Sequence, residues 1–196
     1  VYMILTRHFP VQNLTQSLSL AAFSIGVMFL IFQYRYELRI LGLFASALIS
    51  AIMLMTWMIP ETPVQGNEVL KGFWFYAHII LIFSGEAALG LACGAGILYL
   101  LQEKGIKSKS PGFFFRRLPS LDLLDNVGYV CLTKGFGLLT AGLVTGFIYA
   151  RVVWGQFWSW DLKEVFSVGS WIVYAGLLHL RLRAGWRGRW SWGQAL

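Results

Sequence analysis

Charged residues are scarce in this sequence. Only 13% of its 196 residues are Asp, Glu, Lys or Arg, whereas 57% are hydrophobic and the mean hydropathy is +0.63. A soluble domain of this length needs more charge to cover its surface. The composition therefore excludes an ordinary soluble globular protein and predicts a membrane protein.

Cysteine is also scarce, and the sequence contains no CxxCH motif. Without that motif the chain is not itself a c-type cytochrome, because the motif supplies the thiols for covalent haem attachment. Cys93 and Cys131 lie far apart within apolar runs, where small apolar side chains commonly serve helix packing. The sequence shows no Ser-His-Asp or Cys-His arrangement that would indicate nucleophilic catalysis.

Long apolar runs take the place of the missing charge. A helix needs about 20 apolar residues to cross the hydrocarbon layer of a bilayer. We expect an all-α, polytopic helical membrane bundle that forms a single membrane domain over residues 1–196. Its transmembrane helices, about five in number, are predicted at Leu14–Gln33, Leu38–Ile59, Phe73–Leu101, Val127–Val153 and Val165–Leu182.

The net charge of +7 could indicate nucleic acid, but the distribution of the basic residues argues against such a partner. If the chain crosses the membrane five times, three basic clusters fall on one side: Arg35 and Arg39; Lys104, Lys107, Lys109, Arg116 and Arg117; Arg181, Arg183, Arg187 and Arg189. The positive-inside rule makes that side cytoplasmic. We therefore expect a lipid bilayer and no nucleic acid as partner, with the N-terminus and residues 154–164 facing outward.

An unusual stretch, Trp154 to Glu164, reads WGQFWSWDLKE. Tryptophan gathers at membrane interfaces because its ring is amphipathic, and that tendency explains one or two of these rings. It does not explain three tryptophans within seven residues, followed at once by an acid, a base and another acid. The pattern predicts a broad, flat aromatic shelf beside fixed charges, which suits a large planar ligand with anionic substituents.

This stretch resembles the WWD signature of membrane haem-handling proteins used in cytochrome c assembly. It is most similar to the System II cytochrome c synthetase subunits of the CcsA/ResC type, where the pattern reads roughly WGxYWxWDPKE and a Leu-His pair follows in the next helix. Here the pair is Leu178–His179, and Tyr76–His78 is similar to a helix start that carries a histidine in the family. Phe157 and Leu162 depart from the pattern but remove neither a ring nor a charge.

The resemblance implies a haem translocation and presentation subunit of a cytochrome c synthetase. Such a subunit moves b-type, non-covalently bound haem to the outer face for thioether attachment to the CxxCH of apocytochrome c. It implies that His78 and His179 are iron ligands, at an outer and an inner station respectively. It also implies that the chain forms part of a haem-ligating complex rather than containing a catalytic nucleophile.

The candidate cofactor-binding residues are therefore Trp154, Trp158, Trp160, Asp161, Lys163, His78 and His179, and their neighbours Arg151 and Glu164 have supporting roles. The rings of Trp154, Trp158 and Trp160 would surround the haem, and Lys163, with Arg151, would pair with its propionates. Asp161 and Glu164 would orient Lys163, bond to backbone amides near the start of the fifth helix, or face the apocytochrome. A helix N-terminus favours acids at such positions.

The resemblance also implies partners and a location. We expect a membrane partner subunit of the CcsB/ResB type, apocytochrome c as client, and a bacterial inner membrane or thylakoid membrane. The first residue is Val1 rather than an initiator methionine, and relatives carry further helices on both sides. We therefore expect this chain to be the central part of a larger protein.

Spacing alone bears on how the two histidines are used. His179 lies 14 positions after Val165, or about 21 Å along a helix axis at 1.5 Å per residue, so it is predicted near the inner end, away from the WWD stretch. Two haem stations then fit better than one shared iron. A structural b-type haem subunit of a respiratory complex, which needs paired histidines at equal depth, and a regulatory haem-binding relative remain as alternatives.

Two charges fall inside predicted spans. Glu86 and Lys134 lie on consecutive helices, where a central charge costs on the order of 2.5–3.5 kcal/mol on insertion scales. Opposite charges suggest mutual compensation, directly or through water. The competing interpretation has Lys134 reaching the cytoplasmic headgroups and Glu86 protonated against another helix or a missing subunit.

Overall fold

The computed structural model describes residues 13–37, 39–60, 72–107 and 118–184, and these ranges contain no strand. They form five helices, which are α2 (Leu14–Tyr36), α3 (Leu41–Met58), α4 (Phe73–Lys107), α5 (Leu121–Trp154) and α6 (Leu162–Ala184). Each helix is long and apolar enough to cross a membrane. The predicted all-α membrane bundle is confirmed.

The helix ends follow local capping chemistry. Asn13 begins α2, where its side-chain oxygen accepts a hydrogen bond from the Gln16 amide at 2.9 Å. Ser120 begins α5 in the same way, accepting from the Leu123 amide at 3.3 Å. Both side chains satisfy amides that the first helical turn leaves unpaired. Gly155 ends α5 with a φ of 73°, a left-handed conformation that glycine adopts without steric cost.

The two central helices are longer than their predicted spans. α4 contains 35 residues and α5 contains 34, so each is about 50 Å long at 1.5 Å per residue. The hydrocarbon layer is only about 30 Å thick, so both helices extend beyond it. The prediction ended α4 at Leu101 and began α5 at Val127 because it counted apolar residues alone.

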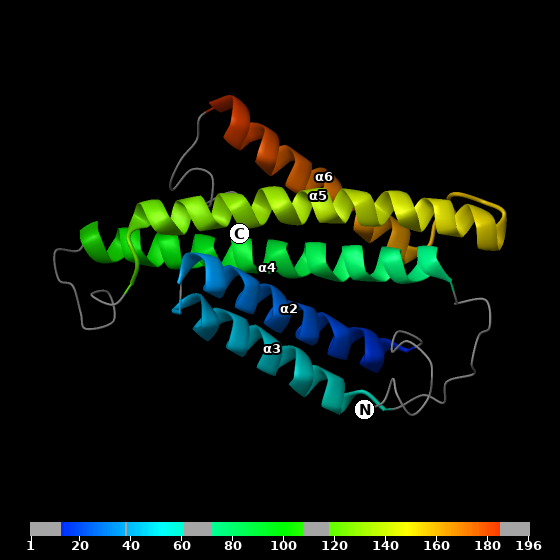
Figure 1. The fold of residues 1–196 in the computed structure, drawn as a ribbon, viewed down its shortest axis with the longest axis horizontal. Coiled ribbons are helices and arrows are strands. Elements are labelled where there is room, and N and C mark those ends of the chain that lie inside the picture. The colour runs from blue at the N-terminus through cyan, green and yellow to red at the C-terminus, as the bar shows by residue number, and fades with distance from the viewer. Residues whose placement is uncertain (1–12, 38, 61–71, 108–117, 185–196) are drawn as a thin grey trace.

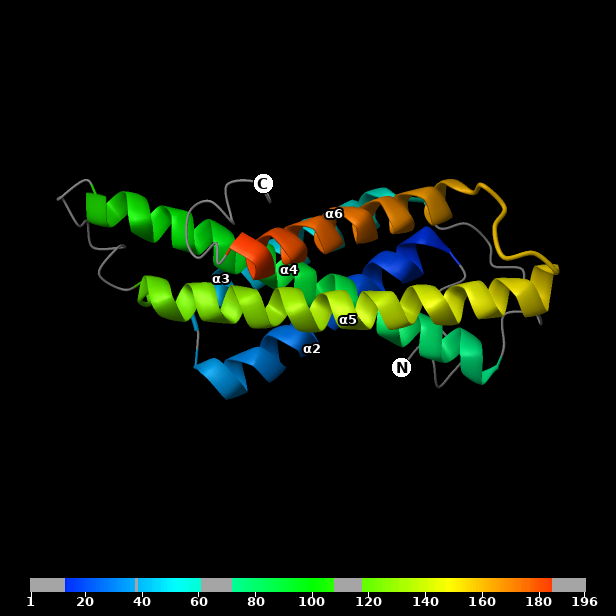
Figure 2. The ribbon, with the colours of Figure 1, turned by 90° about the horizontal axis from the view of Figure 1, so that it is seen from above.

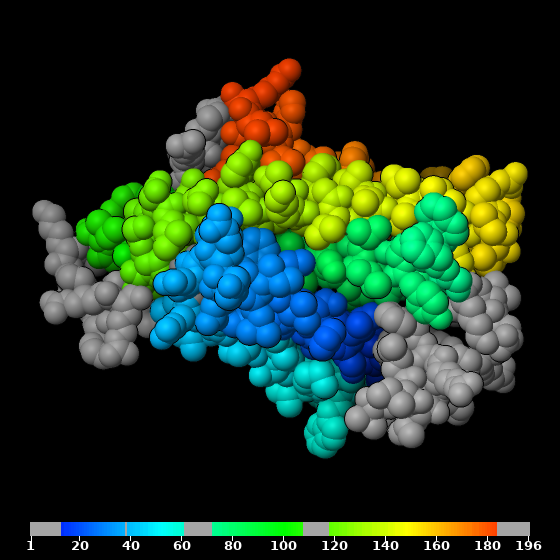
Figure 3. All heavy atoms as spheres, viewed as in Figure 1, coloured from blue at the N-terminus to red at the C-terminus, as the bar shows by residue number. Residues whose placement is uncertain are grey.

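α4 and α5 form a central antiparallel pair, and the other described helices, α2, α3 and α6, lie around it. Figure 1 shows this pair along the longest axis, with α2 and α3 on one side and α6 inclined on the other. In Figure 2, turned by 90°, α4 crosses behind α5. The space-filling view in Figure 3 shows α2 lying over the middle of the pair. We call the end where α4 begins and α5 ends the WWD end, and the opposite end the far end.

Glycine allows α4 and α5 to approach until their backbones touch. A Cβ atom placed on Gly85 of α4 would lie 2.8 Å from the backbone nitrogen of Leu139 and 3.1 Å from the carbonyl oxygen of Gly135. A Cβ on Gly135 would in turn lie 2.9 Å from the side chain of Leu89. Close approach over small residues is the main way that helices associate in lipid, where apolarity alone gives no driving force. Gly85 and Gly135 therefore allow the close packing at this crossing.

α6 is attached far more loosely than the other central elements. Only 6% of the most apolar 18-residue segment of α6 is buried, whereas 50% of the corresponding segment of α4 is buried. Its inward face includes Trp171, Tyr174 and Leu178, which pack partly buried against the hydrophobic core. Trp171 donates its indole N–H to the Thr140 hydroxyl at 2.9 Å and stacks on the Phe136 ring at 5.5 Å. The rest of α6 therefore presents an open apolar surface.

Several charges used to predict orientation lie outside the described residues. They are Lys109, Arg116 and Arg117, between α4 and α5, and Arg187 and Arg189, after α6. Among the described residues, Lys104 and Lys107 lie at the far end of α4, and Arg181 and Arg183 lie in the last turn of α6.

Candidate functional site

The WWD stretch connects α5 to α6, and the loop is fastened by its own side chains. The Glu164 carboxylate accepts two hydrogen bonds from Ser159, one from the backbone amide at 2.8 Å and one from the hydroxyl at 2.9 Å. This arrangement extends the usual capping box, in which an acid in the first helical turn reaches back to an amide before the helix. The predicted bonding of Glu164 to a backbone amide near the start of the fifth helix is present.

We call the two Glu164–Ser159 hydrogen bonds the clasp. The residue after Ser159 has an uncommon backbone conformation. Trp160 has a φ of 59°, in the left-handed region that bulky residues rarely occupy. It directly follows Ser159, whose amide and hydroxyl are both held by Glu164. Such a conformation persists only where the surroundings impose it, and such residues gather at functional sites. The loop thus fixes the direction of the Trp160 ring.

The three tryptophans do not form one flat shelf. Trp158 and Trp160 touch edge to face, with centroids 5.6 Å apart and an interplanar angle of 88°. Trp158 also packs on Phe147 of α5 at 6.1 Å. Trp154 instead contacts Tyr149 edge to face at 6.1 Å. The perpendicular rings correct the prediction of a single planar surface.

Trp154 belongs to a second aromatic group, nearer the end of the bundle. Tyr149, which it contacts, also packs on Phe75 of α4 with centroids 5.6 Å apart. Phe75 and Tyr149 are buried, whereas Trp154 is 62% exposed and Trp160 79% exposed. Both exposed rings are therefore available to a ligand or to lipid at the WWD end.

His78 is the most firmly placed of the candidate ligands. Its Nδ1 lies 2.8 Å from the carbonyl oxygen of Gly142 on α5. A carbonyl can only accept, so Nδ1 carries the proton and donates it. The other ring nitrogen, Nε2, then keeps a lone pair in the neutral ring, which is the arrangement of a metal-ligating imidazole oriented by a backbone carbonyl.

Gly146 provides the space for the His78 ring. A Cβ atom at that position would lie 2.6 Å from Cε1 and 2.8 Å from Nδ1 of His78. Any side chain there would displace the ring from α5 and break its hydrogen bond to Gly142. We call the place on α5 where the His78 ring packs its seat. The sequence signal for it is a pair of glycines four residues apart, Gly142 and Gly146, in the helix next to the one that carries the histidine.

His78 and the Trp158–Trp160 pair are brought to about the same level of α5. The histidine packs on Gly146, and Trp158 packs on the next residue, Phe147. Successive helical residues differ by about 1.5 Å in height and about 100° in direction. The loop therefore folds back so that its tryptophans lie beside the histidine level, on an adjacent side of α5.

The predicted charged partners behave differently from one another. Arg151 donates a hydrogen bond to the Gly155 carbonyl, and its guanidinium lies 5.5 Å from the Phe157 ring centroid. It is therefore engaged in shaping the loop, although an arginine retains further donors. Lys163 and Asp161 are exposed, and neither side chain forms an ion pair with another described residue. Lys163 is the cation of this loop most available to an anionic ligand group.

His179 lies at the opposite end of the bundle from His78. Two residues after it, Arg181 forms an ion pair with Asp125 near the start of α5, with Nη2 and Oδ2 2.7 Å apart. His78, by contrast, packs near the end of α5. The imidazole of His179 is exposed. The two histidines thus lie at different depths, as their spacing predicts.

The predicted direct pairing of the two intramembrane charges is not found among the described residues. Within the described ranges, no ion pair joins Glu86 and Lys134, and both residues are exposed. An ion pair between α5 and α6, Arg181–Asp125, was not predicted. From the sequence, Arg181 counts only as one of the basic residues predicted to face the cytoplasm. Which charges meet depends on the rotation of each helix, and the sequence does not give that rotation directly.

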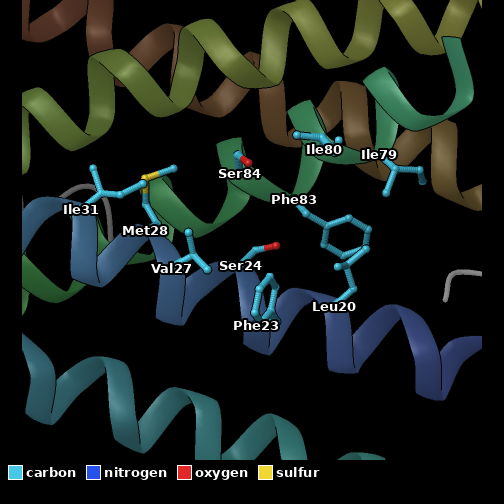
Figure 4. Close-up of a pocket in the computed structure, with 10 residues that line it drawn as sticks. All are labelled: Leu20, Phe23, Ser24, Val27, Met28, Ile31, Ile79, Ile80, Phe83 and Ser84. Carbon is cyan, nitrogen blue, oxygen red and sulfur yellow. The ribbon is translucent and has the colours of Figure 1, made fainter. Parts of the chain in front are cut away.

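The structure has an apolar groove away from the predicted site, and the described part of the chain contains no cluster of metal ligands. No three His, Cys, Asp or Glu side chains gather there as a metal cluster, so each histidine would serve singly. An apolar groove of about 260 Å³ lies between α2 and α4 and contains none of the predicted site residues. Figure 4 shows its lining, in which Ser24 and Ser84 lie among apolar side chains of α2 and α4, including the rings of Phe23 and Phe83.

Comparison with known proteins gives a consistent result. The family described as cytochrome C assembly protein matches residues 11–195. "Cytochrome c biogenesis protein CcsA" of Prochlorococcus marinus (strain MIT 9515) is 31% identical over 209 residues, covering 95% of this chain and 67% of the relative. The protein of the same name from Synechococcus sp. (strain CC9902) is 29% identical, covering 93% of this chain and 68% of the relative.

Proposed function

Because the chain belongs to the cytochrome c assembly protein family and has a role in cytochrome c biogenesis, we propose that it is the haem-translocating and haem-presenting subunit of a cytochrome c synthetase. It would move haem to the outer face of the membrane and present it to the CxxCH thiols of apocytochrome c. The observation that carries the proposal is the seat of His78, whose Nδ1–H is held by Gly142 while Nε2 is left as a ligand.

The residues at the WWD end fit haem as a substrate. Imidazole is a suitable axial ligand for haem iron, and His78 has the tautomer that ligation requires. Trp158 and Trp160 meet at 88°, so one ring can lie against the porphyrin face while the other borders its edge. Lys163 supplies a cation for a propionate. This chemistry supports a non-covalently bound, b-type haem.

Haem supplies the vinyl groups that the two thiols of the apocytochrome convert to thioethers. The work of this chain is to hold the iron, fix the orientation of the porphyrin and keep the vinyl edge accessible. The perpendicular Trp158–Trp160 pair and the clasped loop suit that positioning role. No catalytic nucleophile is assigned to the chain.

His179 would serve an earlier, inner station. Its exposed position on α6 suits a haem shared with a second membrane subunit, which we expect to be of the CcsB/ResB type. The separation of the two histidines argues against the structural b-type alternative, in which both would bind at one depth. The WWD end would face the extracytoplasmic side of a bacterial inner membrane or a thylakoid membrane.

The test uses the complete protein with its membrane partner. We expect His78→Ala to lower the yield of haem-stained c-type cytochrome at least about tenfold and to change the axial-ligation absorbance of the purified complex. His179→Ala should instead lower the total haem that co-purifies, as measured by the pyridine haemochrome, because it acts at the earlier station.

Two results would contradict the proposal. Normal cytochrome c maturation by both histidine variants would exclude haem presentation and leave a regulatory role. Identical spectral changes in the two variants, with one haem per complex and no maturation defect, would favour the structural b-type subunit.

A further inference from the structure

The far end of the bundle contains a buried ion pair that the proposed function does not yet use. The Arg181 guanidinium lies 2.7 Å from the Asp125 carboxylate and donates a further hydrogen bond to the Asp125 carbonyl at 3.1 Å. It also lies 5.0 Å from the centroid of the Tyr129 ring. The two charged side chains are 7% and 14% exposed. Arg181 is the only charged residue of the described chain that is classed as buried.

The ion pair fixes the end of a helix that has few other attachments. Figure 1 shows α6 inclined to α5. Two polar contacts between these helices, Trp171–Thr140 and Arg181–Asp125, lie 10 residues apart on α6 but 15 apart on α5. These separations are about 15 and 22 Å at 1.5 Å per residue. The long arginine side chain bridges the difference, and it does so with directed bonds.

Those bonds also set the rotation of α6. Each residue advances about 100° around a helix, so His179 lies about 200° from Arg181, on nearly the opposite face. Leu178, next to the histidine, packs against the core, whereas His179 is exposed. With Arg181 held on α5, the imidazole is directed away from this chain and toward whatever lies beside α6.

We propose that Arg181 and Asp125 form a rotational lock that presents His179 to a haem held between this chain and a second membrane subunit. They are positioning residues for the inner station, and Tyr129 supports the guanidinium through its ring face. The assignment of haem to His179 rests on the proposed function. The setting of the rotation of α6 does not.

The test measures that rotation without haem. Spin labels are attached at His179→Cys or Leu178→Cys in the full protein lacking Cys93 and Cys131, reconstituted in bilayers, and their collision rate with dissolved oxygen is measured. With the lock intact, we expect the label at 179 to collide at least about threefold more often than the label at 178. In Asp125→Leu/Arg181→Leu the ratio should fall toward one.

The double substitution is chosen because replacing both members of a buried ion pair by apolar residues is often neutral for stability, whereas removing one member is not. Arg181→Lys is the second variant in case the first fails to fold. It keeps the charge but loses the length and the fork geometry, so an intermediate ratio is expected. Arg183→Leu is the matched control, because Arg183 is exposed on the same turn and should leave the ratio unchanged.

The outcomes separate the two proposals. A lost ratio together with lost His179-dependent haem absorbance supports both the lock and the inner station. A lost ratio in a protein whose parent shows no His179-dependent haem supports the lock and overturns the haem assignment. An unchanged ratio in folded Asp125→Leu/Arg181→Leu, or in Arg181→Lys if only that variant folds, overturns the lock.

Discussion

α5 packs against α4 on one side and against α6 on another, and we call these two interfaces seams. They are built in opposite ways. Against α4, α5 packs backbone to backbone over Gly85 and Gly135, and the same seam seats the His78 ring on Gly146. Against α6, it is held by side chains, through an indole hydrogen bond near the middle and a buried ion pair at the far end. The first seam holds His78 by contacts within one chain. The second leaves His179 exposed, so in the proposed function the inner haem station would be completed from outside this chain.

This difference predicts how each seam fails. A glycine seam accommodates added atoms poorly where the nearest neighbour is backbone, as at Gly85, because backbone cannot rotate away. A polar seam loses only the interaction that is removed, and the helices can adjust around it. Substitutions should therefore have large effects on the α4–α5 seam and graded effects on the α5–α6 seam.

The largest effect on folding should come from Gly85→Val. The added side chain begins with a Cβ only 2.8 Å from the Leu139 backbone nitrogen. Overpacking of this kind costs about 1–3 kcal/mol. Folded yield in detergent and thermal stability by size-exclusion chromatography should both fall. Gly137→Val is the control, since a Cβ at Gly137 meets nothing within 4 Å among the described residues. Equal losses in the two variants would contradict a backbone seam.

The next effect is on the site rather than on the fold. Gly146→Ala should displace the His78 ring, because the new Cβ would lie 2.6 Å from Cε1. We expect cytochrome c maturation to fall about tenfold, a change of about 1.4 kcal/mol, while folded yield stays within about twofold. Gly137→Ala has the same change in helix propensity and is the matched control. If maturation by Gly146→Ala equals that of the control, the seat has no part in haem presentation.

A smaller effect is expected in the loop that joins the two seams. Glu164→Ala removes both bonds to Ser159 and should destabilise the loop by about 1 kcal/mol, as the loss of a cap does. Trp160 should then leave its left-handed conformation, which tryptophan fluorescence and quenching by acrylamide would detect as greater exposure. Ser159→Ala keeps the backbone bond and should show a lesser change. An equal or larger change in Ser159→Ala would argue that the hydroxyl alone holds the loop.

The smallest effect should come from the polar contact in the α5–α6 seam. Trp171→Phe removes the indole donor to Thr140 but retains a ring that can stack on Phe136. Hydrogen bonds between membrane helices average about 0.6 kcal/mol. The variant should fold with a shift in the denaturation midpoint that is reproducible yet far below that of Gly85→Val. A loss as large as that of Gly85→Val would show that the α5–α6 seam is as rigid as the α4–α5 seam.

The sequence by itself determined which segments are helical and membrane-spanning. Apolar length is a local property, and the five predicted spans correspond to α2 through α6. The ends were less accurate, because α4 and α5 continue through polar residues such as Glu103 and Asp122 that a helix tolerates outside the lipid. The WWD stretch was also evident from its letters alone, as an aromatic cluster followed by charges.

Only the tertiary structure decided which of these residues meet. Rotation and crossing of helices determine that Gly146 seats His78, that Trp154 separates from Trp158 and Trp160, and that Arg181 joins Asp125. The Trp160 backbone is left-handed beside the clasp, and its ring is perpendicular to that of Trp158. The sequence had suggested one flat aromatic surface. Contacts between helices depend on small residues and long polar side chains spread over several segments. No single stretch of sequence specifies them, whereas twenty apolar residues in a row specify a span.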